Sequence, residues 1–489
     1  MLFNSLSYFV FLPIVVLVYF LLPHKFRWGF LLLASCYFYM AFIPKYILIL
    51  LALVLIDYLA ALGIETQQGK KRKALLIASI VANVGILVVY KYYGFFSENL
   101  TALATLLHWN LPLPILKFAL PLGLSFHTFQ SMSYTIEVYK GKWKAERHLG
   151  IYALYVLFFP QLVAGPIERP AELLPQFRSS HRPEPQNFSS GLKRILWGLF
   201  KKTVLADHLA VVVSRVFSGM GNFSGMTIIV TAIFFSYQIY CDFSGYSDIA
   251  IGSAQILGLR LRENFNNPYW ARSIRDFWKR WHISLTSWFR DYVYIPLGGN
   301  RVSRGRWAAN IFATFLLSGL WHGANWNFIA WGALHGSYQI LSVATLKFRD
   351  SLKKFFHLLN YPGWLRFIGT AWTFLLVSLA WIFFRAPNMA DVLTSFTNIV
   401  RHPSCSLNGS SWHVSSCLTQ LNLSVLSFGF LILGIFFFEF INYLNRGLSP
   451  SDFLGKQPTW IRWSVYYFLI ICILFLGFKQ SYTFIYFQF

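Results

Sequence analysis

The chain has 489 residues, of which 56% are hydrophobic, 19% aromatic and only 12% charged. An ordinary soluble domain carries about 25% charged residues, and disordered chains lack abundant aromatic side chains, so both classes are excluded and a polytopic membrane protein is predicted. The formal net charge of +24 does not indicate nucleic-acid binding, because the basic residues lie in short loops between apolar runs, as in the cytosolic loops of membrane proteins.

Apolar runs long enough to cross, or nearly cross, a hydrocarbon core of roughly 30 Å recur along the whole chain. They lie near residues 5–22, 28–43, 46–64, 74–90, 113–134, 149–164, 195–217, 226–241, 308–322, 327–346, 366–384, 420–444 and 463–480. Some are short enough to be re-entrant, so we expect an all-α fold with about eleven transmembrane helices plus re-entrant and interfacial helices. We do not expect the first run to be a cleavable signal, because it lacks a basic segment before it.

The basic loops predict the orientation of the chain. Among the first six runs, alternate loops hold ten lysines and arginines, against three in the intervening segments. Basic residues favour cytosolic loops, so we expect the N-terminus to lie outside. Basic loops near 347–366 and 446–462 place the C-terminal residues outside as well.

We predict a single membrane domain over residues 1–489 with four regions. Residues 1–164 are plain apolar runs with short loops, which predicts a helical scaffold. Residues 165–346 add Arg, Trp, Asp, Asn and His and form the predicted catalytic core with a basic cytosolic funnel. Residues 347–480 are C-terminal helices, and residues 481–489 are an extracytoplasmic aromatic tail.

The cysteines leave one question open. Cys405 and Cys417 share a polar loop that is predicted to face outward, where disulfides persist, so a bridge and two free thiols are both possible. No cluster of cysteine and histidine has the spacing of metal ligands, and we expect no metal site.

Residues 272–295 predict one amphipathic helix. Bulky apolar residues share one face and basic or polar residues share the other: Phe277, Trp281, Leu285 and Trp288 against Arg275, Lys279, His282, Thr286 and Arg290. Such a helix is typical of a membrane surface. Alternatively its basic face lines an entrance for an anionic ligand, because region 255–306 holds ten basic residues against three acidic ones.

The chemistry of that basic cluster suits two kinds of anion. Arginine binds phosphate with two parallel hydrogen bonds, and the same cluster suits anionic lipid headgroups. The candidate contacts to a phosphorylated donor are Arg275, Lys279, Arg280 and Arg290.

His322 is the leading candidate for chemistry. Sixteen residues of helix after Arg306 would carry it about 24 Å, and Gly323 and Asn325 then interrupt the run. A histidine in an apolar helix is commonly a hydrogen-bonded core residue, but irregular polar backbone at depth favours a functional cavity. Apolar burial favours a neutral imidazole, which can take a proton from a hydroxyl. We expect Trp321 and Asn325 to support it.

Two carboxylates close another apolar run, in YCDFSGYSDIA at residues 240–250. Asp242 and Asp248 would each cost about 2.5–3.5 kcal/mol at mid-membrane, so they must be paired, hydrated or interfacial. We favour a supporting role, in which they anchor arginines or backbone groups, over direct acid–base work.

Four segments together resemble the membrane-bound O-acyltransferase family: AGPIERP (164–170), YCDFSGYSDIAIG (240–252), FWKRWHISLTSWFRDYVYIPLGGN (277–300) and SGLWHGANWNFIAWGALHG (318–336). The resemblance extends along the whole chain and is nearest to the bacterial branch of alginate acetylation, peptidoglycan acetylation and D-alanyl transfer. It implies transfer of an acyl group from a cytosolic thioester, acetyl-CoA in acetylating members, toward an extracytoplasmic polymer. It further implies that His322 is the catalytic base and His282 a supporting or donor-positioning residue.

The C-terminal residues FIYFQF (484–489) match the F-x-Y-F-x-F ending of this branch. They could be an interface anchor or a docking strip for a partner. A bolder hypothesis is that Tyr486 accepts the acyl group covalently, which requires a base such as His322 because a phenol has a pKa near 10. No G-x-S-x-G nucleophile motif is present, so the final transfer is expected from a separate extracytoplasmic partner of the SGNH type.

These observations predict an O-acetyltransferase of the bacterial inner membrane. It would pass acetyl from acetyl-CoA to a partner that O-acetylates a polysaccharide, such as an alginate-type exopolysaccharide or peptidoglycan. A D-alanyl or lipid acyltransferase is the alternative within the family. A transporter or a non-catalytic scaffold is the alternative outside it, although the paired repeats typical of transporters are not apparent.

Overall fold

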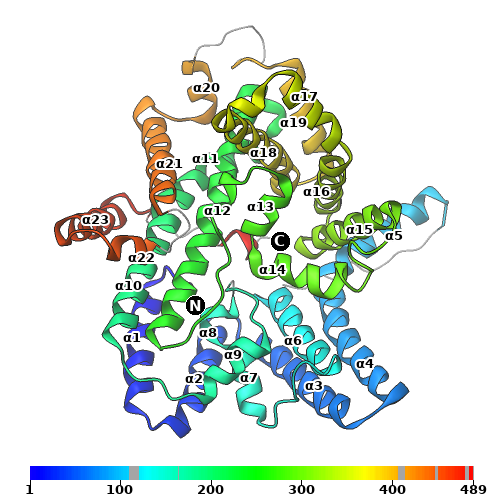
Figure 1. Ribbon diagram of the computed structural model, residues 1–489, viewed down its shortest axis with the longest axis vertical. Coiled ribbons are helices and arrows are strands. Elements are labelled where there is room, and N and C mark those ends of the chain that lie inside the picture. The colour runs from blue at the N-terminus through cyan, green and yellow to red at the C-terminus, as the bar shows by residue number, and fades with distance from the viewer. Residues whose placement is uncertain (110–120, 164, 406–413, 446–449, 479–483, 488–489) are drawn as a thin grey trace. The chain divides into compact units, whose positions relative to one another are not determined.

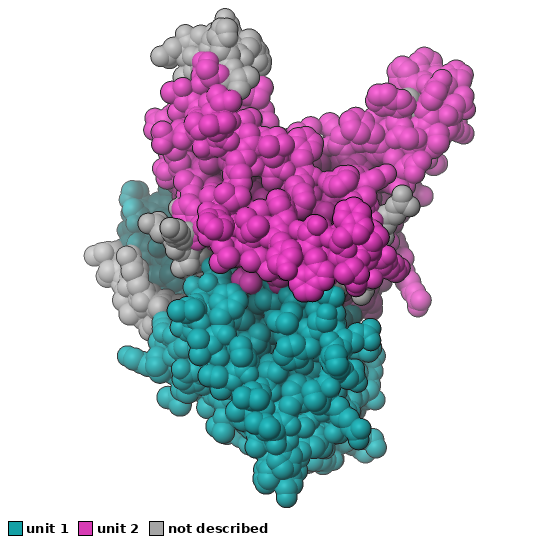
Figure 2. All heavy atoms as spheres, turned by 90° about the vertical axis from the view of Figure 1, so that its left-hand side faces the viewer, with its two compact units in different colours: residues 1–195, 246–262 teal, residues 196–245, 263–489 magenta. Residues whose placement is uncertain are grey.

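The computed structural model describes the chain except for residues 110–120, 164, 406–413, 446–449, 479–483 and 488–489. The described residues form helices joined by turns, with no strand among them, which confirms the predicted all-α class. Parts of the predicted run 113–134 and of the predicted tail 481–489 lie outside the described residues. The chain divides into two compact units, residues 1–195 with 246–262 and residues 196–245 with 263–489, which Figure 2 colours separately.

Six described helical segments are long and apolar enough to cross a membrane: Pro44–Thr66, Gly69–Leu106, Gly225–Ile256, Pro362–Arg385, Val425–Leu444 and Thr459–Leu476. Helix α1 (Leu6–Leu21) is also apolar but shorter. The chain is therefore a multi-pass membrane protein. The expectation of about eleven crossings stays a prediction.

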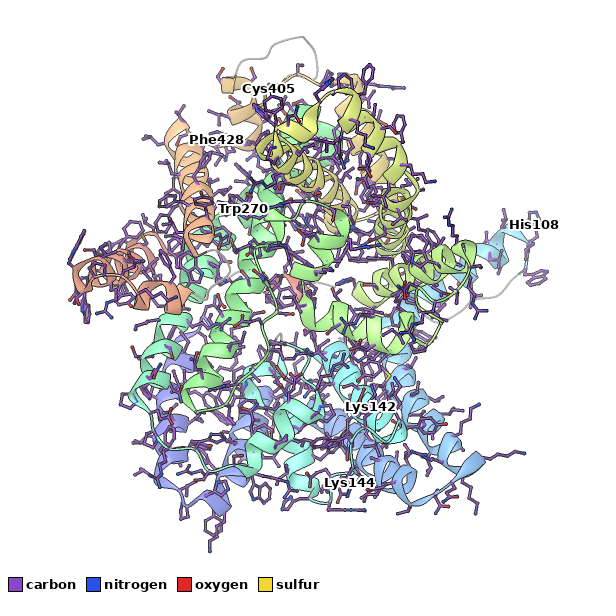
Figure 3. The ribbon with its side chains drawn as sticks, viewed as in Figure 1. His108, Lys142, Lys144, Trp270, Cys405 and Phe428 are labelled. Atoms are coloured by element: carbon purple, nitrogen blue, oxygen red, sulfur yellow. A yellow bond between two sulfur atoms is a disulfide. The ribbon has the colours of Figure 1, made fainter. Side chains whose placement is uncertain are left out.

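Unit 1 has other bounds than the predicted scaffold 1–164, because it also includes residues 165–195 and 246–262; its helices are labelled in Figure 1. After α1 it contains α2 (His24–Met40), α3 (Ile47–Thr66), α4 (Gly69–Leu87), α5 (Tyr93–Leu106), α6 (Leu124–Tyr139), α7 (Leu149–Leu157), α8 (Phe159–Leu162), α9 (Pro170–Arg178) and most of α10 (Pro185–Leu199). Lys142 and Lys144, in the turn after α6, are exposed (Figure 3), in keeping with a basic loop.

One helical segment of unit 1 extends beyond the predicted run 74–90. A π-helical turn, η2 (Val88–Tyr92), joins α4 to α5, so that helix continues from Gly69 to Leu106. Lys91 and its tyrosine neighbours lower the hydropathy there without breaking the backbone pattern, and a π turn accommodates an extra residue inside a helix.

A buried carboxylate holds the scaffold helices together. Asp57 on α3 accepts hydrogen bonds from Ser79 Oγ at 2.6 Å and from Asn83 Nδ2 at 2.9 Å, both on α4. All three residues are fully buried. Buried polar groups need such partners, and this cluster is structural.

Unit 2 contains the remaining elements. They are η3 (Phe200–Ala206), α11 (Asp207–Phe217), η4 (Met220–Asn222), most of α12 (Gly225–Ile256), η5 (Pro268–Trp270), α13 (Ile274–Arg280), α14 (Ile283–Phe289), η6 (Arg290–Tyr294), α15 (Arg304–His322), α16 (Trp326–Ala344), α17 (Leu346–Phe355), η7 (Leu358–Asn360), α18 (Pro362–Arg385), α19 (Met389–Arg401), α20 (Val414–Leu421), α21 (Val425–Asn445), α22 (Pro450–Gly455), α23 (Thr459–Ile471), η8 (Cys472–Leu476) and η9 (Ile485–Phe487). Trp270, labelled in Figure 3, donates to Glu439 Oε2 on α21 at 2.6 Å.

The single amphipathic helix predicted over 272–295 is wrong. The chain forms α13, leaves the helical conformation at Trp281 and at His282, which has a left-handed backbone conformation (φ 44°, ψ 56°), and continues as α14 and η6. The four apolar residues of the predicted face are buried as expected, but His282 is only 1% exposed and does not belong to a basic surface. A left-handed non-glycine residue is costly and persists only where its surroundings hold it.

Helices α15 and α16 form a closely packed hairpin. Gly319 and Gly332 face each other, and a Cβ at either position would collide with a backbone carbonyl, that of Phe328 or that of Phe315. Small residues let helix backbones approach closely within a membrane protein. The hairpin fixes the position of His322 at the end of α15.

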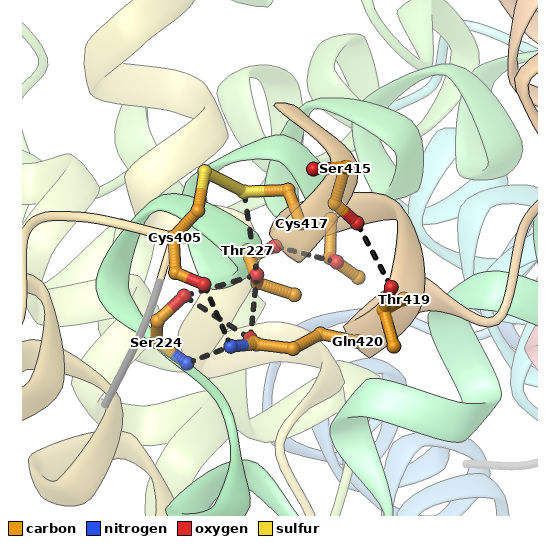
Figure 4. Close-up of a disulfide and its surroundings, with 8 residues drawn as sticks. Ser224, Thr227, Cys405, Ser415, Cys417, Thr419 and Gln420 are labelled. Atoms are coloured by element: carbon orange, nitrogen blue, oxygen red, sulfur yellow. Dashed lines mark hydrogen bonds between the residues drawn. A yellow bond between two sulfur atoms is a disulfide. The ribbon is translucent and has the colours of Figure 1, made fainter. Parts of the chain in front are cut away.

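Cys405 and Cys417 form a disulfide, which settles the alternative that the sequence left open (Figure 4). The bridge joins the segment after α19 to α20. Beside it, Gln420 Nε2 donates to the Cys405 carbonyl at 2.9 Å, and its Oε1 accepts from Thr227 Oγ1 on α12 at 2.7 Å. The disulfide segment is thereby attached to a long membrane-spanning helix.

Candidate active site

His322 ends α15 inside an aromatic enclosure. Its ring centre lies 5.1 Å from that of Trp331 on α16 and 5.2 Å from that of Phe384 on α18, and the residue is 5% exposed. The chain must turn immediately afterwards, and a side chain at Gly323 would collide with the Phe328 ring. The glycine therefore allows the helix to end with the imidazole facing this enclosure.

His282 is oriented by a residue that sequence reasoning missed. Its Nδ1 lies 3.0 Å from Asn264 Oδ1, which also accepts hydrogen bonds from Ser284 N and Ser284 Oγ. Because the backbone N–H of Ser284 must donate, the Asn264 atom is the oxygen, and His282 Nδ1 carries the proton in this arrangement. Burial lowers the pKa of His282 to about 3. The imidazole is therefore neutral at physiological pH, with Nε2 as its basic nitrogen.

Residues 484–486 belong to unit 2, and Tyr486 has a ring contact with each of the two histidines. Phe484 and Ile485 are 0% and 1% exposed. The Tyr486 ring centre lies 5.8 Å from that of His322 and 6.4 Å from that of His282. Burial raises the pKa of Tyr486 well above its ordinary value. Phe484 and Ile485 are too buried to serve as an exposed interface anchor or docking strip, whereas Tyr486 is half-buried.

A buried ion-pair cluster holds the backbone of this tail. Lys202 Nζ lies 2.7 Å from Asp242 Oδ1 and 2.9 Å from Asp207 Oδ1. The other oxygen of Asp242, Oδ2, accepts a hydrogen bond from the Ile485 backbone N–H at 2.8 Å. Sequence reasoning predicted an anchoring role for Asp242 but missed Lys202 and Asp207, although ionisable residues within the apolar run 195–217 were a signal for them.

The other predicted supporting residues have different environments. Trp321 is buried, with its ring centre 4.9 Å from that of His322 and 6.4 Å from that of His282. Asn325 caps α16 by accepting from the Asn327 backbone N–H at 3.1 Å. Asn325 therefore acts as a helix cap.

Asp248 is not part of this cluster. It belongs to unit 1, where its Oδ1 accepts hydrogen bonds from Arg194 at 2.9 and 3.0 Å. Both residues are buried. Asp248 thus anchors an arginine, which is the role that the sequence favoured over acid–base work.

The four predicted donor contacts fall into two groups. Arg275 and Lys279 are exposed and lie one turn apart on α13, where neighbouring cations could bind phosphate groups. Arg280 and Arg290 instead form ion pairs of 2.8 Å with Asp276 and Asp291. The exposed pair suits a phosphorylated ligand better than the two arginines that are already paired.

Comparisons with known proteins give the chemical context. Residues 146–383, which include both histidines, match the model of MBOAT, the membrane-bound O-acyltransferase family. The chain is 35% identical over 443 residues to a probable alginate O-acetylase, AlgI, of Azotobacter vinelandii, covering 88% of this chain and 84% of that protein. It is 35% identical over 496 residues to a peptidoglycan O-acetyltransferase of Helicobacter pylori, covering 94% and 86%.

A third similarity is shorter. The chain is 31% identical over 247 residues to a teichoic acid D-alanyltransferase of Streptococcus thermophilus, which covers 48% of this chain and 59% of that protein. The similarity to the two acetylating proteins therefore extends over most of the chain, and this third similarity extends over about half.

Proposed function

Because the chain belongs to the membrane-bound O-acyltransferase family, we propose that it moves an acetyl group from cytosolic acetyl-CoA to an extracytoplasmic partner that O-acetylates a polysaccharide. The single observation that carries the proposed route is the position of Tyr486. Tyr486 is half-buried, with its hydroxyl oxygen buried, and two imidazole rings lie 5.8 and 6.4 Å from its own ring. It therefore has the parts of an activated nucleophile: an acceptor oxygen and bases to take its proton.

The proposed first step is an acyl transfer from sulfur to oxygen. His322 takes the Tyr486 phenolic proton as Oη attacks the thioester carbonyl carbon. The new bond joins that carbon to Oη, the carbon–sulfur bond breaks, and the thiolate leaves and is protonated by the imidazolium. The products are free CoA and an acetyl ester on Tyr486, with His322 neutral again.

His282 has a supporting part in this proposal. Asn264 holds its Nδ1–H, so Nε2 carries the lone pair, and in this proposal it accepts a hydrogen bond from the phenol or from a water near the thioester. Its low pKa keeps it neutral, so it adds no cation that would weaken the basicity of His322. It is therefore an orienting residue, and His322 is the base.

The second step would take place at the outer face. A hydroxyl of an SGNH-type partner attacks the acetyl ester, the acetyl carbon–Oη bond breaks, and the phenol regains a proton. The acetyl group thereby reaches the partner and then the polysaccharide without the polymer entering the membrane. We propose that the protein resides in a bacterial inner membrane with both termini outside, as the basic loops predict.

The donor would bind through its phosphates. The proposed contacts are Arg275 and Lys279, which are exposed on α13. Arg280 and Arg290 each have an acidic partner, so they would contribute to the positive electrostatic potential and not to direct contacts with the phosphates. The chemistry needs only a thioester. A D-alanyl thioester is therefore the second candidate donor, supported by the similarity of about half the chain to a teichoic acid D-alanyltransferase.

Release of the CoA thiol tests this function. The protein in nanodiscs is incubated with acetyl-CoA and a soluble hydroxyl acceptor, and His322→Ala is compared with His357→Ala, an exposed histidine. We expect His322→Ala to lower thiol release by at least about 100-fold and His357→Ala to retain it. Equal release from both variants would contradict a catalytic base at His322, and no release from the parent protein would favour a transporter or scaffold.

A further inference from the structure

Three buried charged side chains of unit 2 form a cluster that contacts the backbone of Ile485. The side chains of Lys202 and Asp207 are each 1% exposed, and that of Asp242 is 4% exposed. Burying three charges is costly unless they are paired and hydrogen-bonded. Here one ammonium group bridges two carboxylates, at 2.9 and 2.7 Å.

The cluster also makes one contact with the backbone of the C-terminal segment. Asp242 uses Oδ1 for Lys202 and directs Oδ2 to the Ile485 backbone N–H at 2.8 Å. Hydrogen bonds to an ionised acceptor are about twice as strong as neutral ones. The acceptor lies within α12, which is 32 residues long, so the tail is bonded to a rigid element.

The bonded residue directly precedes the proposed acyl carrier. Ile485 is the first residue of the short helix η9, and Tyr486 is the second. A hydrogen bond at the backbone of Ile485 limits both the position and the rotation of the Tyr486 side chain that follows it. Phe243, the residue after Asp242, adds a ring contact of 4.6 Å to Tyr486.

We propose that Asp242, held in place by Lys202, is a positioning residue that fixes the tail through the Ile485 N–H so that the Tyr486 phenol stays beside His322. The consequence for acyl transfer rests on the proposed function, whereas the docking of the tail does not. Lys202 acts through Asp242, which it holds in one orientation, and Asp207 in turn holds Lys202.

Substitution of Ile485, whose backbone N–H donates to Asp242, tests the anchoring role without changing the buried charges. Ile485→Pro removes the N–H, and proline is tolerated at the first position of a helix. Ile485→Val keeps the N–H and nearly the same volume. In nanodiscs, carboxypeptidase digestion followed by mass spectrometry measures how fast each protein loses Phe487, whose peptide bond to Tyr486 does not involve the substituted residue. We expect loss at least about ten-fold faster in Ile485→Pro, because proteolysis follows the population of the released segment.

The carboxylate is tested by a second pair of variants. Asp242→Asn weakens the acceptor, and Asp57→Asn is the matched loss of a buried carboxylate in unit 1. We expect Asp242→Asn to lower kcat for thiol release roughly ten-fold with KM for acetyl-CoA unchanged, and to expose the tail as Ile485→Pro does. Asp57→Asn should leave the digestion rate of the tail unchanged. If Asp242→Asn does not fold, the Ile485 pair still decides the question.

The outcomes separate this proposal from the proposed function. Equal digestion of Ile485→Pro and Ile485→Val would overturn the anchoring role even if Tyr486 carries acetyl. Faster digestion of Ile485→Pro, with no acetyl on Tyr486 in any protein, would support the anchor and contradict the relay. An Asp242→Asn protein that is digested faster but keeps its kcat would contradict the positioning of Tyr486 for catalysis.

Discussion

The Tyr486 ring lies 5.8 Å from the His322 ring, although the two residues come from the C-terminal tail and from the end of α15. Both rings are enclosed by aromatic side chains, and Phe384 contacts each of them. Proton transfer between a phenol and an imidazole in apolar surroundings would proceed without competition from bulk water. The proposed acyl relay rests on this proximity.

The orientation of His282 depends on Asn264, which supplies an oxygen to His282 Nδ1 and to Ser284. Asn264→Leu should lower kcat roughly ten-fold with an unchanged KM for acetyl-CoA, because the imidazole loses its fixed tautomer. The lost hydrogen bonds should also destabilise the protein by about 1–3 kcal/mol. Asn398→Leu, which removes another buried amide, is the control. Equal kcat values for the two variants would argue against an orienting role.

Donor binding should depend on the exposed cations of α13. The double variant Arg275→Glu, Lys279→Glu should raise KM for acetyl-CoA about ten-fold or more, equivalent to roughly 1.4 kcal/mol, and leave kcat within about two-fold. Lys353→Glu, on exposed α17, is the control for charge reversal. The effect should shrink at high salt, because exposed charges are screened. An unchanged KM would move the donor site away from α13.

Stability should fall as the pH falls below the ordinary pKa of histidine. Burial lowers the pKa of folded His282 to about 3, while an unfolded histidine titrates near 6.5. Between these values only the unfolded chain binds the proton, so stability is complete above about pH 6.5 and decreases by up to about 1.4 kcal/mol per pH unit below it. Thermal unfolding of the parent and of His282→Gln between about pH 7 and pH 4 should show a shallower dependence in the variant. Parallel curves would contradict a buried neutral imidazole.

The disulfide offers a test of orientation. Cys405 and Cys417 lie in a segment that the basic loops place outside, so intact cells with an accessible outer face should show labelling of both cysteines by a membrane-impermeant maleimide only after reduction. Peptide mapping distinguishes them from Cys36, Cys241 and Cys472, which are not bridged. Labelling without a reductant would contradict the bridge, and labelling only after lysis would reverse the topology.

Most of the helices were predictable, because length and hydropathy alone determine where apolar helices lie. The break at His282 was not, because helical periodicity continues through ARSIRDFWKRWHISLTSW without a glycine or proline. The helix α13 ends there because of a tertiary contact, in which Asn264 Oδ1 accepts hydrogen bonds from His282 and Ser284. Local sequence carries no sign of a partner that lies elsewhere in the chain.

The candidate site was predictable in its chemistry but not in its geometry. His322 was singled out by the polar residues after an apolar run, and Tyr486 by resemblance to a family ending. Lys202 and Asp207 lie within a predicted apolar run and do not stand out there. Their contacts with Asp242 depend on how η3 and α11 pack against α12. The burial of Phe484 and Ile485 was likewise hidden, since an aromatic tail fits an interface equally well.

The covalent relay is tested most directly by the fate of a labelled acetyl group. The protein in nanodiscs is mixed with acetyl-labelled CoA in the absence of any partner, quenched, and digested, and the C-terminal peptide is analysed for the parent, Tyr486→Phe and His322→Ala. The account predicts one acetyl ester on Tyr486 of the parent, lost on addition of a hydroxyl nucleophile, and no label on either variant. A parent protein that releases the CoA thiol while its C-terminal peptide stays unlabelled would contradict it.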